Sequence, residues 1–310
     1  GESFTTETLS VLYNPAASKS VLIVNNFHRL ASPQVVDDEE KQGFDLNQDP
    51  GVSYGLTAGW SGKQQVFDRS RMGSGNEMIG KFVAGNDFNY VQAHATSIAA
   101  SGKYNISSCS SEVIASGRVQ MKNYQAVDLI NGLERHDGYT HTFFKSFTPA
   151  LQNSIRQYAS QGGRILISGS YTGSDMQTEE EQAFLSDILK LSYEPTGSTA
   201  ITRDINPEDS TVTERDSIVY TSPNVKGLGL QFSYYNELNA QHYAATHPEI
   251  LKPVGNYAFT AMQYDTGTSA AVAYKSTTYR SFVMGFPLEC IIDERTRTSV
   301  LLGILKFLTD

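Results

Sequence analysis

The sequence predicts an α/β fold with a mostly parallel central sheet flanked by helices and an antiparallel, β-rich C-terminal extension. Apolar runs at 20–26, 126–130 and 164–168 are continuous, as expected of strands buried on both faces. Segments of helical periodicity lie between these runs, which is typical of alternating strand and helix units. Beyond Tyr193 the apolar period changes to two, which indicates antiparallel strands bounded by Gly, Pro and Asn.

The chain is organised around one large domain. Residues 1–18 are expected to form a leading strand or the tail of a preceding module, and residues 19–310 a single α/β domain. Residues 34–89 are rich in Gly, Asp, Asn and Gln and show no sustained period. A structureless stretch of that length is unusual in a compact domain, so we expect either an excursion over the site or an ordered loop region with short helices.

Individual elements follow from local signals. The expected helices are residues 91–101, one beginning at Thr148-Pro149 and ending at Gly162-Gly163, one from the capping box at Thr178 through Leu191, and a last one capped by Asp293. A weak strand is expected at 104–108, and the C-terminal strands are expected at 228–235, 258–264, 269–275 and 280–286.

Composition excludes several classes of function. The net charge is -9 and no more than two Lys or Arg residues are adjacent, so nucleic acid is not an expected partner. No run of about 18 apolar residues exists, so no membrane span is expected. The two cysteines, Cys109 and Cys290, lack metal-site spacing and are expected to be buried free thiols. We expect neither a metal nor a cofactor.

The most informative candidate site is the small-residue loop 168–173, which follows the strand at 164–168. In open α/β sheets, ligand sites collect at the carboxyl ends of strands. Ser170 can be interpreted as a nucleophile on a sharp turn, with neighbouring N–H groups holding an oxyanion. Against this, the next helix begins only near Thr178, and a serine needs a base. The alternative is a hydrogen-bonding serine in a glycine-rich loop.

Several segments together carry a family resemblance. They are 127–134, 158–173, 270–274, 282–289 and the last helix, strengthened by 21–30 and 67–71. Over about Ser20 to Leu308 the chain resembles the class I glutamine-amidotransferase-like fold, which is flavodoxin-like. The likeness is to the version found in secreted Bacteroidetes proteins named as xanthan lyases or as N-acetylmuramoyl-L-alanine amidase-associated modules.

The resemblance implies work on polysaccharide or peptidoglycan fragments beside neighbouring domains of a longer chain, in a secreted, periplasmic or cell-surface protein. In the amidotransferases a cysteine holds the nucleophile position, and a His-x-Glu follows a late strand. Here Glu289 is retained, but Phe286 or Pro287 stands where the histidine belongs. The catalytic triad is therefore incomplete. A His-Pro-Glu string at 247–249 lies well before that strand, and we attribute it to chance.

A second group of candidate residues is charged. His28 and Arg29 follow the first strand, and Asp68, Arg69 and Arg71 form a mixed-charge group. Arginines of this kind can hold a carboxylate or uronate bidentately. The alternative is an ion-pair network that pins the long loop to the sheet.

A histidine pair offers a weaker alternative. His136-Asp137 and His141 could ligate a metal if their loop folded them together, but Gly138 between them favours a surface turn.

Three classes of function remain open at this stage. The leading hypothesis is a non-catalytic accessory or ligand-binding module of a secreted polysaccharide- or peptidoglycan-acting protein. The competing hypothesis is a hydrolase or polysaccharide lyase that uses Ser170 or His28, with Glu289 as the retained acid. The third is a scaffold that binds another domain of its own chain. The expected ligand face comprises His28, Arg29, Asp68, Arg69, Arg71, Ser170 and Tyr171.

Overall fold

The structure is a computed structural model, and all that follows concerns the residues it describes. These are 8–27, 34–37, 41–45, 66–68, 73–75, 90–135, 145–194, 218–221, 225, 228–236, 242–245 and 247–310.

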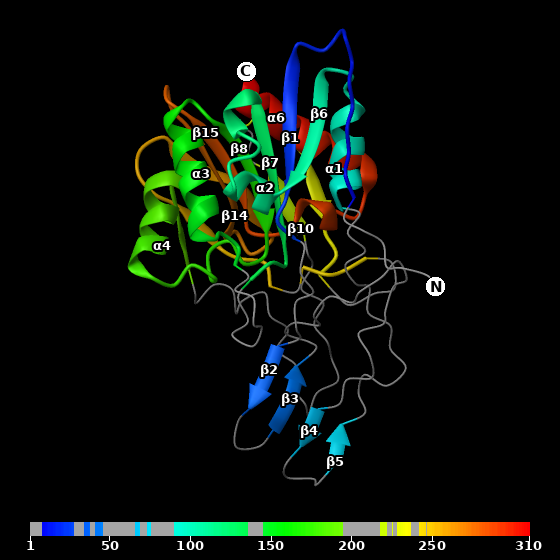
Figure 1. The fold of residues 1–310 in the computed structure, drawn as a ribbon. Helices are drawn as coiled ribbons and strands as arrows, with labels where there is room; N and C mark the ends of the chain where they lie inside the picture. Colours follow the sequence, from blue (N-terminus) through cyan, green and yellow to red (C-terminus); the bar gives the residue numbers. More distant parts are fainter. Residues whose placement is uncertain are drawn as a thin grey trace, which may run out of the picture.

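A nine-stranded mixed sheet forms the centre of the molecule (Figure 1), in the order β11-β10-β13-β14-β15-β8-β7-β1-β6. Its parallel part comprises β6 (Tyr104–Ser110), β1 (Lys19–Asn25), β7 (Ala126–Gly132), β8 (Arg164–Gly169) and β15 (Arg280–Met284). In chain order these five strands lie as second, first, third, fourth and fifth, which is the flavodoxin-like strand order. The predicted parallel core is confirmed.

The antiparallel extension continues from β15. It comprises β14 (Ser269–Lys275), β13 (Ala258–Tyr264), β10 (Ile218–Thr221) and β11 (Gln231–Ser233). The bounds predicted for β13 and β14 are confirmed. The strand expected at 228–235 is shorter, and β15 ends at Met284 rather than at residue 286.

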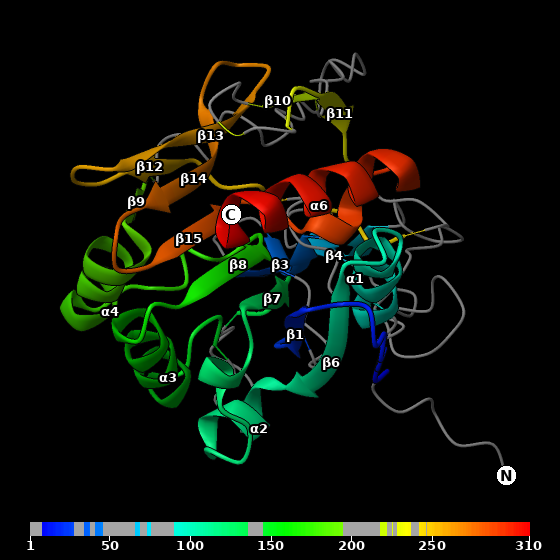
Figure 2. The ribbon, with the colours of Figure 1, turned by 90° about the horizontal axis from the view of Figure 1, so that it is seen from above.

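Helices cover both faces of the sheet (Figure 2). One face carries α1 (Tyr90–Ala99) and α6 (Glu294–Thr309), and the other carries α2 (Ser111–Ala115), α3 (Pro149–Ser160) and α4 (Glu179–Phe184). Strand β1 shows why its apolar run is continuous: Val21 and Ile23 pack in the core of α1 and α6, while Leu22 and Val24 pack in the opposite core. Period-two alternation puts successive side chains on opposite faces, so a strand covered on both sides needs apolar residues at every position.

Helix ends follow the expected capping residues, with one exception. Thr148 accepts a hydrogen bond from Leu151 N at 3.3 Å, and Asp293 accepts one from Thr296 N at 2.7 Å. The helix predicted to run through Leu191 ends earlier. After α4 the chain makes a π-helical turn, η2 (Leu185–Leu189), and Lys190 then adopts a left-handed φ of 60°. Leu191 instead begins strand β9 (Leu191–Tyr193), which pairs with β12 (Leu251–Pro253).

The capping box that begins α4 gives a first testable prediction. Thr178 Oγ1 accepts from Glu181 N at 3.3 Å, and Glu181 Oε2 accepts from Thr178 N at 3.0 Å. Thr178→Ala removes one acceptor, so we expect the free energy of unfolding to fall by about 1 kcal/mol. Thr178→Ser keeps the hydroxyl and is the matched control. Chemical denaturation measures both, and equal losses in the two variants would contradict the capping role.

A separate four-stranded antiparallel sheet occupies part of the region 34–89. It comprises, in order, β2 (Gln34–Asp37), β3 (Lys41–Asp45), β4 (Val66–Asp68) and β5 (Gly73–Gly75). Figure 1 shows it apart from the large sheet. The described parts of this region are strands, so the expected short helices are not found there. Strands of three to five residues are too short to produce a readable period in sequence.

The described N-terminal residues run along β6. Leu12 forms an isolated antiparallel bridge with Ile106, and Asn14 N donates to Asn105 Oδ1 at 2.7 Å. This segment therefore lies beside the edge strand of the nine-stranded sheet.

Candidate functional site

A buried polar network joins the carboxyl ends of β1 and β7 to the following loops. Asn26 Nδ2 donates to Asn131 Oδ1 at 3.0 Å and to the Ser146 carbonyl at 2.9 Å. Ser146 N donates to Asp175 Oδ2 at 2.8 Å. The Ser146 hydroxyl lies within hydrogen-bond distance of the carbonyl oxygens of Glu134, at 2.7 Å, and Tyr171, at 2.9 Å. This network holds together the loops at the carboxyl ends of the parallel strands, where the ligand sites of such sheets collect.

Ser170 is buried beneath these loops and is not exposed at the edge of the sheet. Its side chain is fully buried, and its N–H donates to the Gly132 carbonyl at 2.9 Å. Its hydroxyl has no hydrogen-bond partner among the described residues. The chain here is tightly packed, because a Cβ atom on Gly169 would lie 2.6 Å from that of Asn131. The catalytic assignment of Ser170 stays a prediction, and any acyl group would have to enter a closed turn to reach it.

Glu249 accepts hydrogen bonds from two backbone N–H groups at the end of the β8 loop. Its Oε2 accepts from Gly173 N at 2.6 Å, and its Oε1 accepts from Ser174 N at 2.9 Å. The carboxyl is buried, and this burial raises its pKa to about 8 although the donors from residues 173 and 174 act in the opposite direction. The N–H groups of Gly173 and Ser174 are therefore already bound by a carboxyl of the same chain, and an oxyanion could use them only by displacing it.

Tyr171, like Ser170, belongs to the part of the expected ligand face whose side chains the structure describes. Its ring is buried, with the Arg135 guanidinium carbon 4.7 Å from the ring centroid and the His247 ring stacked at 5.7 Å. From its position in the sequence, the string 247–249 was attributed to chance. In the structure it contacts the β8 loop at two points: His247 stacks on Tyr171, and Glu249 binds the backbone of the loop.

Glu289 lies in a second buried network, which sequence reasoning did not find. It belongs to the 3-10 turn η3 (Leu288–Cys290) and accepts from the Tyr243 hydroxyl at 2.7 Å. His94 on α1 lies between two carboxylates, with Nδ1 2.7 Å from Asp128 Oδ2 and Nε2 3.4 Å from Glu289 Oε2. All three ionisable side chains are fully buried.

The electrostatics of this network favour a charged histidine. Burial by itself lowers the pKa of His94, but Asp128 and Glu289 outweigh it and raise that pKa to about 10. The pKa of Glu289 is below its usual range, because the hydrogen bond and charge of His94 outweigh burial. An imidazolium held between two carboxylates lacks the free lone pair of a general base.

Most of the charged candidates lie outside the described residues. These are His28, Arg29, Arg69 and Arg71, as well as His136, Asp137 and His141. Asp68 ends strand β4, where its backbone pairs with Lys41, and its side chain is not described. The predicted burial of Cys109 and Cys290 as free thiols is confirmed.

Two further properties concern the described part of the chain. No group of three or more His, Cys, Asp or Glu residues within it is arranged to hold a metal ion. None of its helices is both long enough and apolar enough to cross a membrane.

No protein-family model matches the chain, and no curated protein matches it. Among solved structures it is similar to an exo-β-1,4-mannosidase from Opitutaceae bacterium strain TAV5, with TM-score 0.43 and 9% identity, over 71% of this chain and 30% of the mannosidase. The chain thus spans less than a third of that enzyme's length.

Two smaller proteins are also similar. A GMP synthase-type protein from Thermoplasma acidophilum gives TM-score 0.40 and 12% identity, over 70% of this chain and 88% of that one. A ThuA-like protein from Parabacteroides merdae gives TM-score 0.40 and 14% identity, over 70% and 84%. The class of this protein, a flavodoxin-like α/β domain, is assigned from the strand order of its own sheet.

Proposed function

We propose that this chain is a non-catalytic, ligand-binding module of the amidotransferase-like kind that accompanies a secreted polysaccharide- or peptidoglycan-acting protein. The single observation that supports this most is the state of Ser170, which is fully buried and has no base among the described residues within hydrogen-bond distance. A serine hydroxyl without a base is a weak nucleophile at neutral pH.

Two further features support a binding role over an acyl-transfer role. Glu249 fills the N–H groups of Gly173 and Ser174, so an oxyanion would have to compete with a carboxyl already in place. The imidazole of His94, which contacts Glu289, lies within hydrogen-bond distance of a carboxylate at both of its nitrogens. The secreted location and the glycan class of ligand rest on the family resemblance.

The test compares turnover with binding in the full chain. Xanthan, other uronate polymers and muropeptides are incubated with wild type and with Ser170→Ala, and binding of their fragments is followed by calorimetry. We expect saturable binding without turnover, equal in the two proteins. Because the Ser170 hydroxyl is buried and has no hydrogen-bond partner in the part of the chain that the structure describes, we also expect Ser170→Ala to keep its free energy of unfolding or to gain up to about 1 kcal/mol.

The other outcomes separate the competing functions. Turnover that disappears in Ser170→Ala would establish the hydrolase and reject the binding module. Turnover that survives in Ser170→Ala but disappears in His28→Ala would favour the lyase. If the chain shows neither binding nor turnover, the result would favour the third hypothesis, a scaffold that binds another domain of its own chain.

A further inference from the structure

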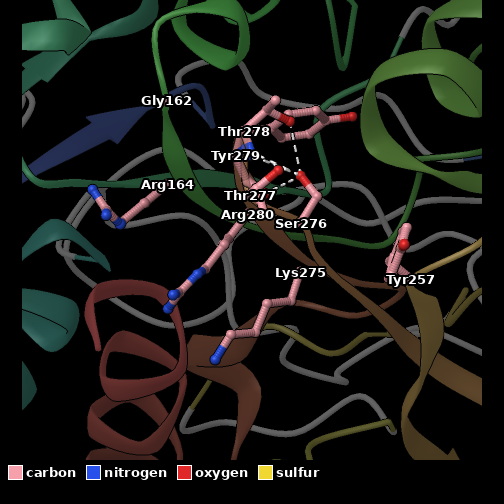
Figure 3. A pocket seen from close by; sticks show the side chains of 9 residues that line it. All are labelled: Gly162, Arg164, Tyr257, Lys275, Ser276, Thr277, Thr278, Tyr279 and Arg280. Atoms are coloured by element: carbon pink, nitrogen blue, oxygen red, sulfur yellow. Dashed lines mark hydrogen bonds between the residues drawn. The ribbon is translucent and has the colours of Figure 1, made fainter.

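A pocket of about 600 Å³, seen from close by in Figure 3, is lined by residues from the end of β14 and the beginning of β8 and β15. It therefore lies at the opposite end of the sheet from the β8 loop. Its volume falls in the range of small-molecule sites, roughly 300–1,000 Å³. Three of the residues that line it are cationic, Arg164, Lys275 and Arg280, and none is acidic. This is a local excess of positive charge on a chain whose net charge is -9.

The three cations form one row across three adjacent strands. Lys275 on β14 pairs directly with Arg280 on β15, and Arg280 pairs directly with Arg164 on β8. Directly paired residues share a face of the sheet, and neighbouring strands are about 4.8 Å apart. In Figure 3 the side chains of Arg280 and Lys275 extend toward the red ribbon of α6, and Arg164 lies on the opposite side of the view from Tyr257. Like charges directly opposite each other are destabilising, so this row carries a cost in the empty protein.

The three cationic side chains of this row have only some of their possible hydrogen-bond and charge partners within the protein. Arg280 Nη1 donates to the carbonyls of Phe307, at 2.7 Å, and Leu308, at 3.3 Å, in the last turn of α6. The Lys275 ammonium is exposed and lies 5.8 Å from the centroid of the Phe307 ring. Arg164 is half-buried, and within the described residues its guanidinium has neither a hydrogen-bond acceptor nor an ion-pair partner. A planar guanidinium in that position is suited to binding a carboxylate bidentately.

The other wall of the pocket is aromatic and rich in hydroxyl groups. Tyr257 is 72% exposed and has a left-handed φ of 71°, a conformation that is strained for a non-glycine residue. In the facing turn, Ser276 Oγ accepts from the N–H groups of Thr278, at 3.1 Å, and Tyr279, at 3.3 Å, which holds that turn in a fixed shape. An exposed ring beside fixed hydroxyl groups is suited to the apolar face and the hydroxyl groups of a sugar.

We propose that this pocket, formed by Arg164, Lys275, Arg280 and Tyr257, binds an acidic oligosaccharide. Successive carboxylates of the oligosaccharide would lie along the row formed by Lys275, Arg280 and Arg164, and the sugar ring at the Lys275 end of the row would lie on Tyr257, whose carbonyl accepts from Lys275 N. The site is separate from the β8 loop, but its ligand class rests on the proposed function. Binding of xanthan fragments or muropeptides that persists unchanged in Arg164→Gln would reject this pocket and leave the proposed function standing.

The experiment uses tetragalacturonate as the probe and calorimetry on the full chain. We expect saturable binding that weakens as ionic strength rises from about 0.01 M to about 0.1 M, because the screening length shortens from about 30 Å to about 10 Å. Arg164→Gln should weaken binding at least tenfold. It should leave the melting temperature equal or higher, since it relieves repulsion within the row. Arg118→Gln, which removes an exposed arginine elsewhere, is the matched control and should bind as wild type does.

Two further variants and a second probe distinguish the possible outcomes of this experiment. Lys275→Gln, at an exposed position, should also weaken binding and serves if Arg164→Gln fails to fold. Tyr257→Gly should weaken binding while it raises the melting temperature, because glycine tolerates the positive φ. Inorganic phosphate that binds as tightly as tetragalacturonate, with the same dependence on Arg164, would reject the sugar and leave a simple anion site. The proposal is overturned if tetragalacturonate does not bind, or if Arg118→Gln weakens binding as much as Arg164→Gln.

Discussion

Asp128→Asn is expected to lower the free energy of unfolding by about 3–5 kcal/mol, since it removes one partner of a buried ion pair. The Asp128 carboxylate lies 2.7 Å from His94 Nδ1, and both side chains are fully buried. After the substitution the imidazolium keeps only Glu289, at the longer distance of 3.4 Å. Either the His94 imidazolium stays buried beside only one carboxylate, or His94 loses its proton and becomes neutral.

Chemical denaturation near pH 6 measures this loss, with Asp187→Asn as the matched control. Asp187 is exposed on η2, so the same change there should alter the free energy of unfolding by less than about 0.5 kcal/mol. Equal effects of the two substitutions would show that the His94–Asp128 pair contributes nothing to stability.

The same pair sets a pH dependence with a definite sign. The pKa of His94 is about 10 in the folded chain against an ordinary 6.5, so its contribution is complete below pH 6.5 and is lost as pH rises toward 10. The lowered pKa of Glu289 acts at the other end, where stability is lost as pH falls below its ordinary value of 4.5. In Asp128→Asn the alkaline loss should shrink. An unfolding free energy that is flat from pH 6.5 to 10 in wild type would contradict the charged state of His94.

This network also shows what could be predicted from sequence and what could not. Glu289 was identified as the retained acid of an incomplete triad, but its partner His94 comes from a helix 195 residues earlier in the chain. Local spacing holds no information on such a contact. A signal was nonetheless present: His94 lies within the apolar face of α1 set by Val91 and Ile98, and Asp128 interrupts the apolar run of β7. Ionisable groups at two core positions need each other.

The buried strands at the centre of the fold were more predictable from the sequence than its short strands. The apolar runs of β1, β7 and β8 are buried on both faces, and such strands leave a clear pattern. Strand β10, which lies between β11 and β13, and the short pair β9 and β12 have no signal in the sequence, because three or four residues that pair through backbone groups require no apolar period. Their positions depend on tertiary contacts, as does the change from α4 to the π-helical turn η2 after Phe184.

Glu249→Ala is expected to lower the free energy of unfolding by about 3 kcal/mol, because two backbone N–H groups lose their acceptors at a buried site. Glu249 binds Gly173 N and Ser174 N through its two carboxyl oxygens. Glu249→Gln keeps one acceptor oxygen and should lose roughly half as much. Glu194→Gln, which breaks an exposed pair with Lys252, is the matched control and should cost less than about 1 kcal/mol.

The pH profile distinguishes this role from simple packing. Burial raises the pKa of Glu249 to about 8 from its ordinary 4.5, so the folded chain holds this proton more tightly than the unfolded chain does. Its contribution is therefore complete below pH 4.5 and is lost as pH rises to 8. The stability difference between wild type and Glu249→Gln should narrow over that interval. A difference that is constant with pH would mean that the carboxyl has an ordinary pKa. It would then bind the N–H groups of the loop after Ser170 as a carboxylate throughout, and an oxyanion there would have to displace a full negative charge.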